Sequence, residues 1–150
     1  MIDARTRFVV SGIPDEALDR IRAAGRDDFG NLVTPQNIEV GDEGAPLRCC
    51  LREATAGDQM AIIAYRSPAG RGAYSEVGPV FIHAQRCDGY PTPDRYPPDF
   101  RRRQQVLRAY DLDGKICDAL LVAGDSADPV IAHLLSRPEV VEVESHNTLF

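Results

Sequence analysis

Three segments in the middle of the chain have patterns of apolar and polar residues that predict β-strands. Residues 59–65 and 77–84 are apolar on both faces, which is typical of central strands of a sheet. Residues 47–52 alternate, so that three apolar residues share one face while two arginines and a cysteine share the other. We therefore expect the centre of the chain to form a sheet.

Further strands are predicted on both sides of this central region. Residues 7–11 form a short apolar run near the start, and residues 140–145 alternate between valine and glutamate near the end. Residues 106–111 and 116–123 predict a hairpin, because the Asp-Gly pair at 113–114 between them suits a tight turn.

Two other segments have apolar residues at helical spacing. The first begins at Pro14, which suits the first helical turn, and ends at Gly25. The second begins near Asp128 and ends before Pro138. Because several strands follow one another directly, the predicted fold is α+β, with a largely antiparallel sheet of six or seven strands and two main helices.

Length and composition narrow the class of protein. The 150 residues suit a single domain spanning 1–150. The net charge of −6 argues against nucleic-acid binding, since such domains are basic. No apolar run approaches the roughly 20 residues that cross a bilayer, and the N-terminus lacks a signal peptide. We expect a cytoplasmic protein that binds neither nucleic acid nor membranes.

The four cysteines, Cys49, Cys50, Cys87 and Cys117, are too sparse for a disulfide scaffold. In a reducing compartment we expect free thiols. Structural zinc sites usually contain two paired ligand motifs, and the chain has none. On the predicted strand 47–52, the adjacent Cys49 and Cys50 would point to opposite faces. The sequence therefore predicts no metal site.

Four strings in the chain resemble one known family. They are RCCL at 48–51, SPAGRGAYSEVGPVFIHAQRC at 67–87, LRAYD at 107–111 and VEVESHN at 141–147. Together they resemble the bacterial family called domain of unknown function 1203, across essentially the whole chain. The resemblance implies a bacterial protein but no activity, because the family is named for having none assigned.

Two positions depart from the pattern of that family. Its members often have Cys-Arg-x-Cys where this chain has Leu47 to Cys50, so that only the second cysteine matches. They also tend to have Arg-Asn and then Gly-Cys-aromatic near the end. Here His146 and Asn147 precede a chain end at Phe150. The resemblance thus leaves two alternatives, a naturally short member or a chain truncated before a final strand.

The candidate catalytic residues are His83, Cys87 and Glu76. His83 ends an apolar strand, four residues before Cys87, and a rigid strand end positions side chains well. A histidine near a cysteine can raise its thiolate fraction and make a nucleophile. Glu76 is a candidate general base. The alternatives are a histidine that caps the sheet edge through backbone hydrogen bonds, a histidine that binds a metal with Cys87 and with Cys50 or His146, and a surface glutamate paired with arginine.

The candidate ligand-binding residues are Arg71, Tyr74, Arg108 and Tyr110. Arg108 and Tyr110 share one face of their predicted strand, and Tyr74 shares an extended segment with Glu76. We expect a pocket at the end of strand 77–84, because pockets need convergent polar groups on an apolar lining.

Three functions remain open from the sequence. The first is an enzyme or small-molecule-binding domain that uses this pocket, and no particular substrate or cofactor follows from the residues. The second is a non-catalytic module that assembles through a sheet edge, including as a homo-oligomer. The third is oxidative-stress sensing through Cys50 and Cys87.

Overall fold

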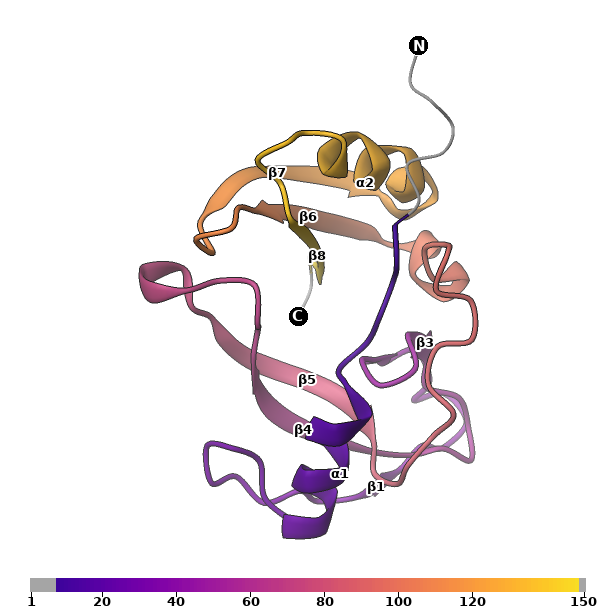
Figure 1. The fold of residues 1–150 in the computed structure, drawn as a ribbon. Helices are drawn as coiled ribbons and strands as arrows, with labels where there is room; N and C mark the ends of the chain where they lie inside the picture. Colours follow the sequence, from indigo (N-terminus) through magenta and orange to yellow (C-terminus); the bar gives the residue numbers. More distant parts are fainter. Residues whose placement is uncertain (1–7, 149–150) are drawn as a thin grey trace. The chain divides into compact units, whose positions relative to one another are not determined.

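The computed structural model describes residues 8–148, which contain two α-helices, eight strands and three short 3-10 helices (Figure 1). These residues fall into two compact units. The described part of unit 1 is residues 8–10, 67–76 and 93–148, and unit 2 is residues 11–66 and 77–92.

Unit 2 contains a mixed five-stranded sheet in the order β1-β4-β5-β2-β3. β4 and β5 pair in antiparallel register from Met60↔His83 to Arg66↔Val77, whereas β2 runs parallel to β5 through Leu47↔Phe81. The strands are β1 (Gln36–Asn37), β2 (Pro46–Leu47), β3 (Arg52–Glu53), β4 (Gln59–Arg66) and β5 (Val77–His83).

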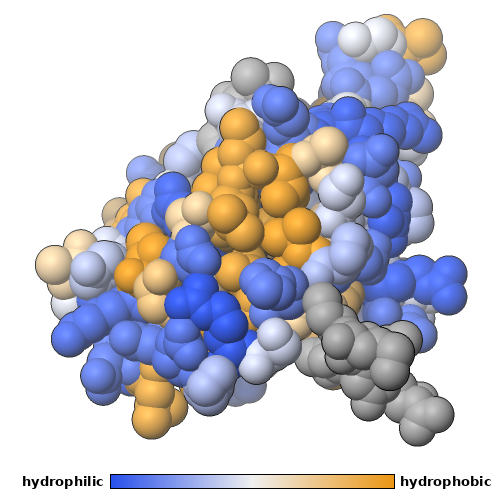
Figure 2. Space-filling model, turned by 90° about the horizontal axis from the view of Figure 1, so that it is seen from above, coloured by the Kyte–Doolittle hydropathy of each residue, from blue (hydrophilic) through white to orange (hydrophobic). Residues whose placement is uncertain are grey.

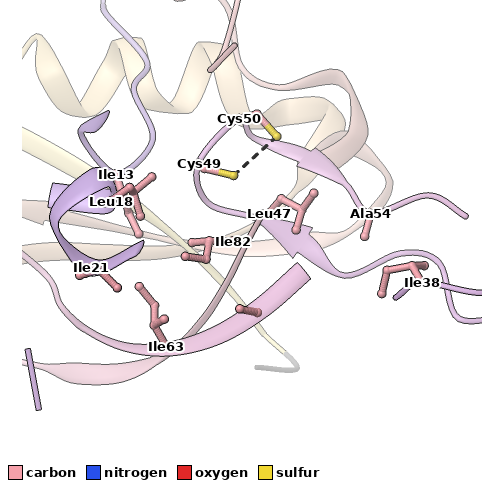
Figure 3. Packing of buried hydrophobic residues seen from close by; sticks show 11 residues of the cluster. Ile13, Leu18, Ile21, Ile38, Leu47, Cys49, Cys50, Ala54, Ile63 and Ile82 are labelled. Atoms are coloured by element: carbon pink, nitrogen blue, oxygen red, sulfur yellow. Dashed lines mark hydrogen bonds between the residues drawn. The ribbon is translucent and has the colours of Figure 1, made fainter. Parts of the chain in front are cut away.

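Helix α1 (Asp15–Ala24) covers this sheet through its apolar face, where Leu18 and Ile21 are buried. It ends at Gly25, whose left-handed conformation (φ 66°) suits glycine. The core of unit 2 comprises Ile13, Leu18, Ile21, Ile38, Leu47, Cys49, Cys50, Ala54, Ala61, Ile63 and Ile82 (Figure 3). Two of the four cysteines are therefore part of this core.

The predicted strand 47–52 is wrong. The chain reverses there, because β2 and β3 pair in antiparallel fashion and residues 48–51 form the turn between them. The amide of Leu51 donates to the Leu47 carbonyl at 2.9 Å, and Leu51 itself has a φ of 58°. The apolar alternation in the sequence reflects burial of this turn rather than a pleated strand.

Unit 1 contains an antiparallel three-stranded sheet in the order β7-β6-β8, with β6 (Gln104–Tyr110), β7 (Ile116–Ala123) and β8 (Glu142–Asn147). Helix α2 (Ala127–Leu135) buries Ala127, Ile131 and Leu134. The 3-10 helices are η1 (Gly72–Tyr74), η2 (Pro98–Arg102) and η3 (Gly124–Ser126). The predicted hairpin of β6 and β7 is confirmed.

The surface of unit 1 exposes several large apolar side chains. Leu120 and Leu121 lie on β7, which is an edge strand, and Leu112 and Val141 are also exposed. Figure 2 shows apolar residues gathered in a patch on the face of the molecule seen from above, with hydrophilic residues around it. Neither α1 nor α2, the helices of residues 8–148, has the length and apolarity to span a bilayer.

The α+β class and the two main helices are confirmed, but the predicted single sheet is not. The strands form two sheets, of which the smaller is antiparallel and the larger mixed. Residues 84–103 contain four prolines and form no strand, so β5 and β6 are not joined as a hairpin. Residues 8–11 of the predicted first strand form none, and residue 7 lies outside the described residues.

Candidate metal centre

Three thiols and one imidazole converge in unit 2. The Sγ atoms of Cys49, Cys50 and Cys87 and a ring nitrogen of His83 all lie within 4.8 Å of one another. The sulfurs of Cys49 and Cys50 are 3.9 Å apart. The Nδ1 atom of His83 is 3.3 Å from the Cys49 sulfur and 3.6 Å from the Cys50 sulfur. These four groups form what we call the cysteine–histidine cluster.

The turn at residues 48–51 brings both adjacent cysteines to the same side. Leu51 closes this turn in a left-handed conformation, and the Arg48 amide donates to the Phe81 carbonyl at 2.7 Å. The turn is thereby fixed against β5, whose last residue is His83. The expectation that Cys49 and Cys50 point apart is wrong, since it assumed a strand. The geometric argument against a shared ion no longer applies.

Contacts from the N-terminal part of unit 2 support the turn. The Ile13 amide donates to the Arg48 carbonyl at 2.9 Å. A Cβ atom on Gly12 would lie only 2.3 Å from that same carbonyl oxygen, so only glycine fits there without displacement. From α1, Arg22 donates Nε and Nη2 to the His83 carbonyl at 3.3 and 3.0 Å. Hydrogen bonds to the carbonyls of Arg48 and His83 thus hold both the 48–51 turn and the end of β5.

A polar network positions the His83 ring from outside the cluster. Its Nε2 atom lies 3.2 Å from Oδ1 of Asp58 and 3.0 Å from Nη2 of Arg52. Asp58 accepts two hydrogen bonds of 2.9 Å from Arg52 and one of 2.7 Å from the Thr55 amide. An unprotonated Nε2 can accept from Arg52, whereas a protonated Nε2 donates to Asp58; in the second tautomer the lone pair of Nδ1 faces the sulfurs.

The charges of the cluster are unequal. The hydrogen bonds that Cys49 accepts from the Cys50 thiol and from the His83 amide lower the pKa of Cys49 despite its burial. The same bond to Cys49, together with burial, raises the pKa of Cys50. Burial also raises the pKa of Cys87. Hydrogen bonds from Arg52 hold the pKa of Asp58 well below its usual range. The cluster therefore favours one thiolate, on Cys49.

The structure divides the candidate catalytic residues. His83 and Cys87 lie together in the cysteine–histidine cluster, and Glu76 is not a member of it. Glu76 belongs to unit 1, where it forms an ion pair with Arg108.

The other candidate ligand-binding residues also lie in unit 1. Tyr110 is buried two residues along β6 from Arg108, and Tyr74 is exposed in η1. Arg71 donates to the Leu112 carbonyl at 3.2 Å. Their ligand-binding role stays a prediction.

Sequence reasoning named Cys50 only in the metal-binding and redox alternatives and gave Cys49 no functional role. It also missed Arg52 and Asp58. One signal was present, because three cysteines and one histidine within residues 49–87 make up a complete tetrahedral ligand set. The spacing of these four residues did not indicate a zinc site, since neither Cys-Cys nor His-x3-Cys is a paired zinc motif.

A family model described as "Protein of unknown function (DUF1203)" matches residues 44–150. The chain belongs to the DUF1203 family. The resemblance identified from the sequence is thereby confirmed. The matched part of this DUF1203 chain includes every member of the cysteine–histidine cluster, together with Arg52 and Asp58. No curated protein and no solved structure matches the chain.

Proposed function

We propose that this DUF1203 protein binds one zinc ion through Cys49, Cys50, His83 and Cys87. The observation that carries the proposal is the mutual approach of four ligand atoms within 4.8 Å. Zinc lies about 2.3 Å from sulfur and about 2.0–2.1 Å from nitrogen, which separates neighbouring ligand atoms of a tetrahedron by roughly 3.5–3.8 Å. The separations of 3.3, 3.6 and 3.9 Å agree with that geometry to within a few tenths of an ångström.

The chemistry of the ligands favours zinc over the common hard cations. Thiolate and imidazole bind zinc well, whereas calcium and magnesium prefer oxygen. A set of three cysteines and one histidine is a known structural zinc combination. Four protein ligands fill a tetrahedral site and leave no position for a substrate. The proposed role of the ion is therefore structural.

The surroundings of the cluster support the same role. Histidine ligands of zinc commonly donate their second N–H to a carboxylate, which is the arrangement of His83 and Asp58. Three strands of unit 2, β1, β2 and β3, contain only two residues each, so their ladders supply few hydrogen bonds. An ion at the cluster would join three parts of unit 2: the 48–51 turn through Cys49 and Cys50, the end of β5 through His83, and the segment after β5 through Cys87.

Metal content and ligand geometry together test the proposal. Protein purified under reducing conditions should contain one equivalent of zinc by elemental analysis. Substitution with cobalt(II) should give the intense visible bands of a tetrahedral site and a sulfur-to-cobalt charge-transfer band. Cys50→Ser should weaken these bands and lower zinc affinity. The matched control is Cys117→Ser, because Cys117 lies in unit 1 and is not a member of the cluster.

Two results would contradict the proposal. The first is wild-type protein that neither retains nor takes up stoichiometric zinc when reduced. The second is Cys117→Ser losing as much metal as Cys50→Ser, because the ion would then be held elsewhere.

A further inference from the structure

The three sulfurs of the cysteine–histidine cluster differ in their access to solvent. Cys49 and Cys50 are only 4% and 6% exposed, whereas Cys87 is half-buried. Cys87 also lies within residues 84–92, which form neither helix nor strand. Of the three cysteines, Cys87 is therefore the one most open to a small oxidant from solvent.

The same sulfur is close enough to its neighbours to form a disulfide. Cys87 Sγ lies within 4.8 Å of both other sulfurs, and a disulfide needs a separation of about 2.05 Å. Rotation of the Cys87 side chain and a small shift of its irregular segment would close that gap. A bond between Cys49 and Cys50 would instead close a small ring that contains a peptide bond, inside a turn already fixed to β5. Bridging to Cys87 is the less strained alternative.

We propose that hydrogen peroxide converts the zinc site into a disulfide between Cys87 and the Cys49–Cys50 pair, and that the ion is thereby released. This inference rests on the proposed zinc site. It gives that site a function as a peroxide-responsive switch in addition to its structural role.

The chemistry balances in two steps. The Cys87 thiolate attacks one peroxide oxygen, so that an S–O bond forms, the O–O bond breaks, and the leaving hydroxide takes a proton to become water. The thiolate of Cys49 or Cys50 then attacks the Cys87 sulfenic acid. An S–S bond forms, the S–O bond breaks, and a second water leaves after protonation. Two thiolates lose two electrons, and one peroxide is reduced to two waters.

Release follows from the loss of ligands. The disulfide removes two of the four ligands, and the remaining cysteine and His83 cannot complete a tetrahedral site. Bound zinc also favours the attack on peroxide, because ligation keeps the cysteine sulfurs as thiolates, which are the nucleophilic form. A dithiol reductant should restore the three thiols and the binding of the ion.

The test uses the full zinc-loaded chain, hydrogen peroxide and a chromogenic zinc indicator, followed by non-reducing peptide mapping. Trypsin cuts after Arg48, Arg52, Arg86 and Arg95, which releases residues 49–52 and 87–95 as separate peptides. We expect zinc release to parallel the appearance of these two peptides linked by a disulfide. Dithiothreitol should reverse both changes.

A variant that keeps four ligands tests the role of the exposed sulfur. Cys87→His offers an imidazole in place of the thiol, so zinc should remain bound while the accessible sulfur is gone. Peroxide should then release zinc about tenfold more slowly than from the wild type, because the remaining sulfurs are buried. Cys117→Ser, which removes a cysteine outside the cluster, should release zinc at the wild-type rate.

The outcomes separate this inference from the proposed function. Absence of zinc before peroxide is added contradicts the zinc site itself. Zinc that is bound at the start but retained under peroxide overturns the switch alone. Release without the linked peptide, or with a bridge confined to residues 49–52, also overturns it. If Cys87→His fails to bind zinc, the peptide map of the peroxide-treated wild type still shows whether Cys87 forms a disulfide with Cys49 or Cys50.

Discussion

At the scale of single residues, the two nitrogens of His83 have different tasks. Nδ1 faces two sulfurs, while Nε2 lies 3.2 Å from a carboxylate that Arg52 holds in place. A carboxylate in this position fixes the tautomer of the ring and increases the basicity of the ligating nitrogen. Asp58 therefore acts on the proposed ion through His83 rather than by contact with it.

This arrangement predicts the effect of Asp58→Asn. The variant should bind zinc about 10- to 100-fold more weakly, because the amide no longer favours a protonated Nε2. A competition titration against a zinc chelator measures the affinity. Asp42→Asn is the control, since it makes the same charge change at an exposed position of unit 2. Equal affinities of the two variants would show that Asp58 has no part in positioning the ligand.

A second carboxylate, Asp27, contributes to the pH dependence of stability. Burial alone would raise its pKa, but hydrogen bonds from the amides of Ala64, Asn31 and Phe29 and from the Asn31 side chain outweigh burial. The pKa of Asp27 is thereby lowered to about 2. Because the folded pKa lies below the unfolded one, the stabilisation is complete above roughly pH 4 and is lost as pH falls toward 2.

The expected contribution of Asp27 is about 2 kcal/mol at neutral pH. Urea unfolding of metal-free protein at a series of pH values measures it. In Asp27→Asn, the free energy of unfolding should be lower at pH 7 and should change less between pH 4 and 2. Asp28→Asn is the control, because Asp28 forms an exposed ion pair with Arg20. A wild-type pH profile in Asp27→Asn would refute the assignment.

At the scale of elements, sequence patterns predicted what is locally determined. The long strands β4, β5, β6 and β7 were predicted to within a few residues, because each contains its own apolar pattern. The same holds for α1 and α2, which have helix-start signals.

The turn at 48–51 was not predictable in this way. Its shape depends on Ile13 and Phe81, which are distant in the sequence, and its αL residue is a leucine rather than a glycine. The approach of Cys49 and Cys50 to His83 and Cys87 was missed for the same reason, because a local pattern does not reveal which side a buried turn presents.

The close approach of Gly12 to that turn predicts a measurable coupling. Gly12→Ala places a methyl group 2.3 Å from the Arg48 carbonyl oxygen, so the turn must shift. We expect a loss of about 1–3 kcal/mol in unfolding free energy and weaker zinc binding. Gly78→Ala is the matched control, since its added methyl meets no atom within 4 Å. Retention of wild-type zinc affinity in Gly12→Ala would show that the turn tolerates the shift.

At the scale of the whole molecule, the chain organises into two compact units, and the proposed ion belongs to one of them. Removing zinc with a chelator should therefore reduce amide protection first in residues 11–66 and 77–92. Hydrogen exchange followed by mass spectrometry resolves these segments from residues 67–76 and 93–148. Equal loss of protection throughout would instead favour one cooperative domain, as the length of the chain predicts.

The order of segments along the chain gives the cluster a place in biosynthesis. Unit 2 ends at residue 92, and its last candidate ligand is Cys87, whereas the unit 1 sheet begins at Gln104. During translation, every ligand of the proposed ion is therefore made before any strand of that sheet. The proposed site could therefore close around zinc before β8, the last strand of the unit 1 sheet, has been made.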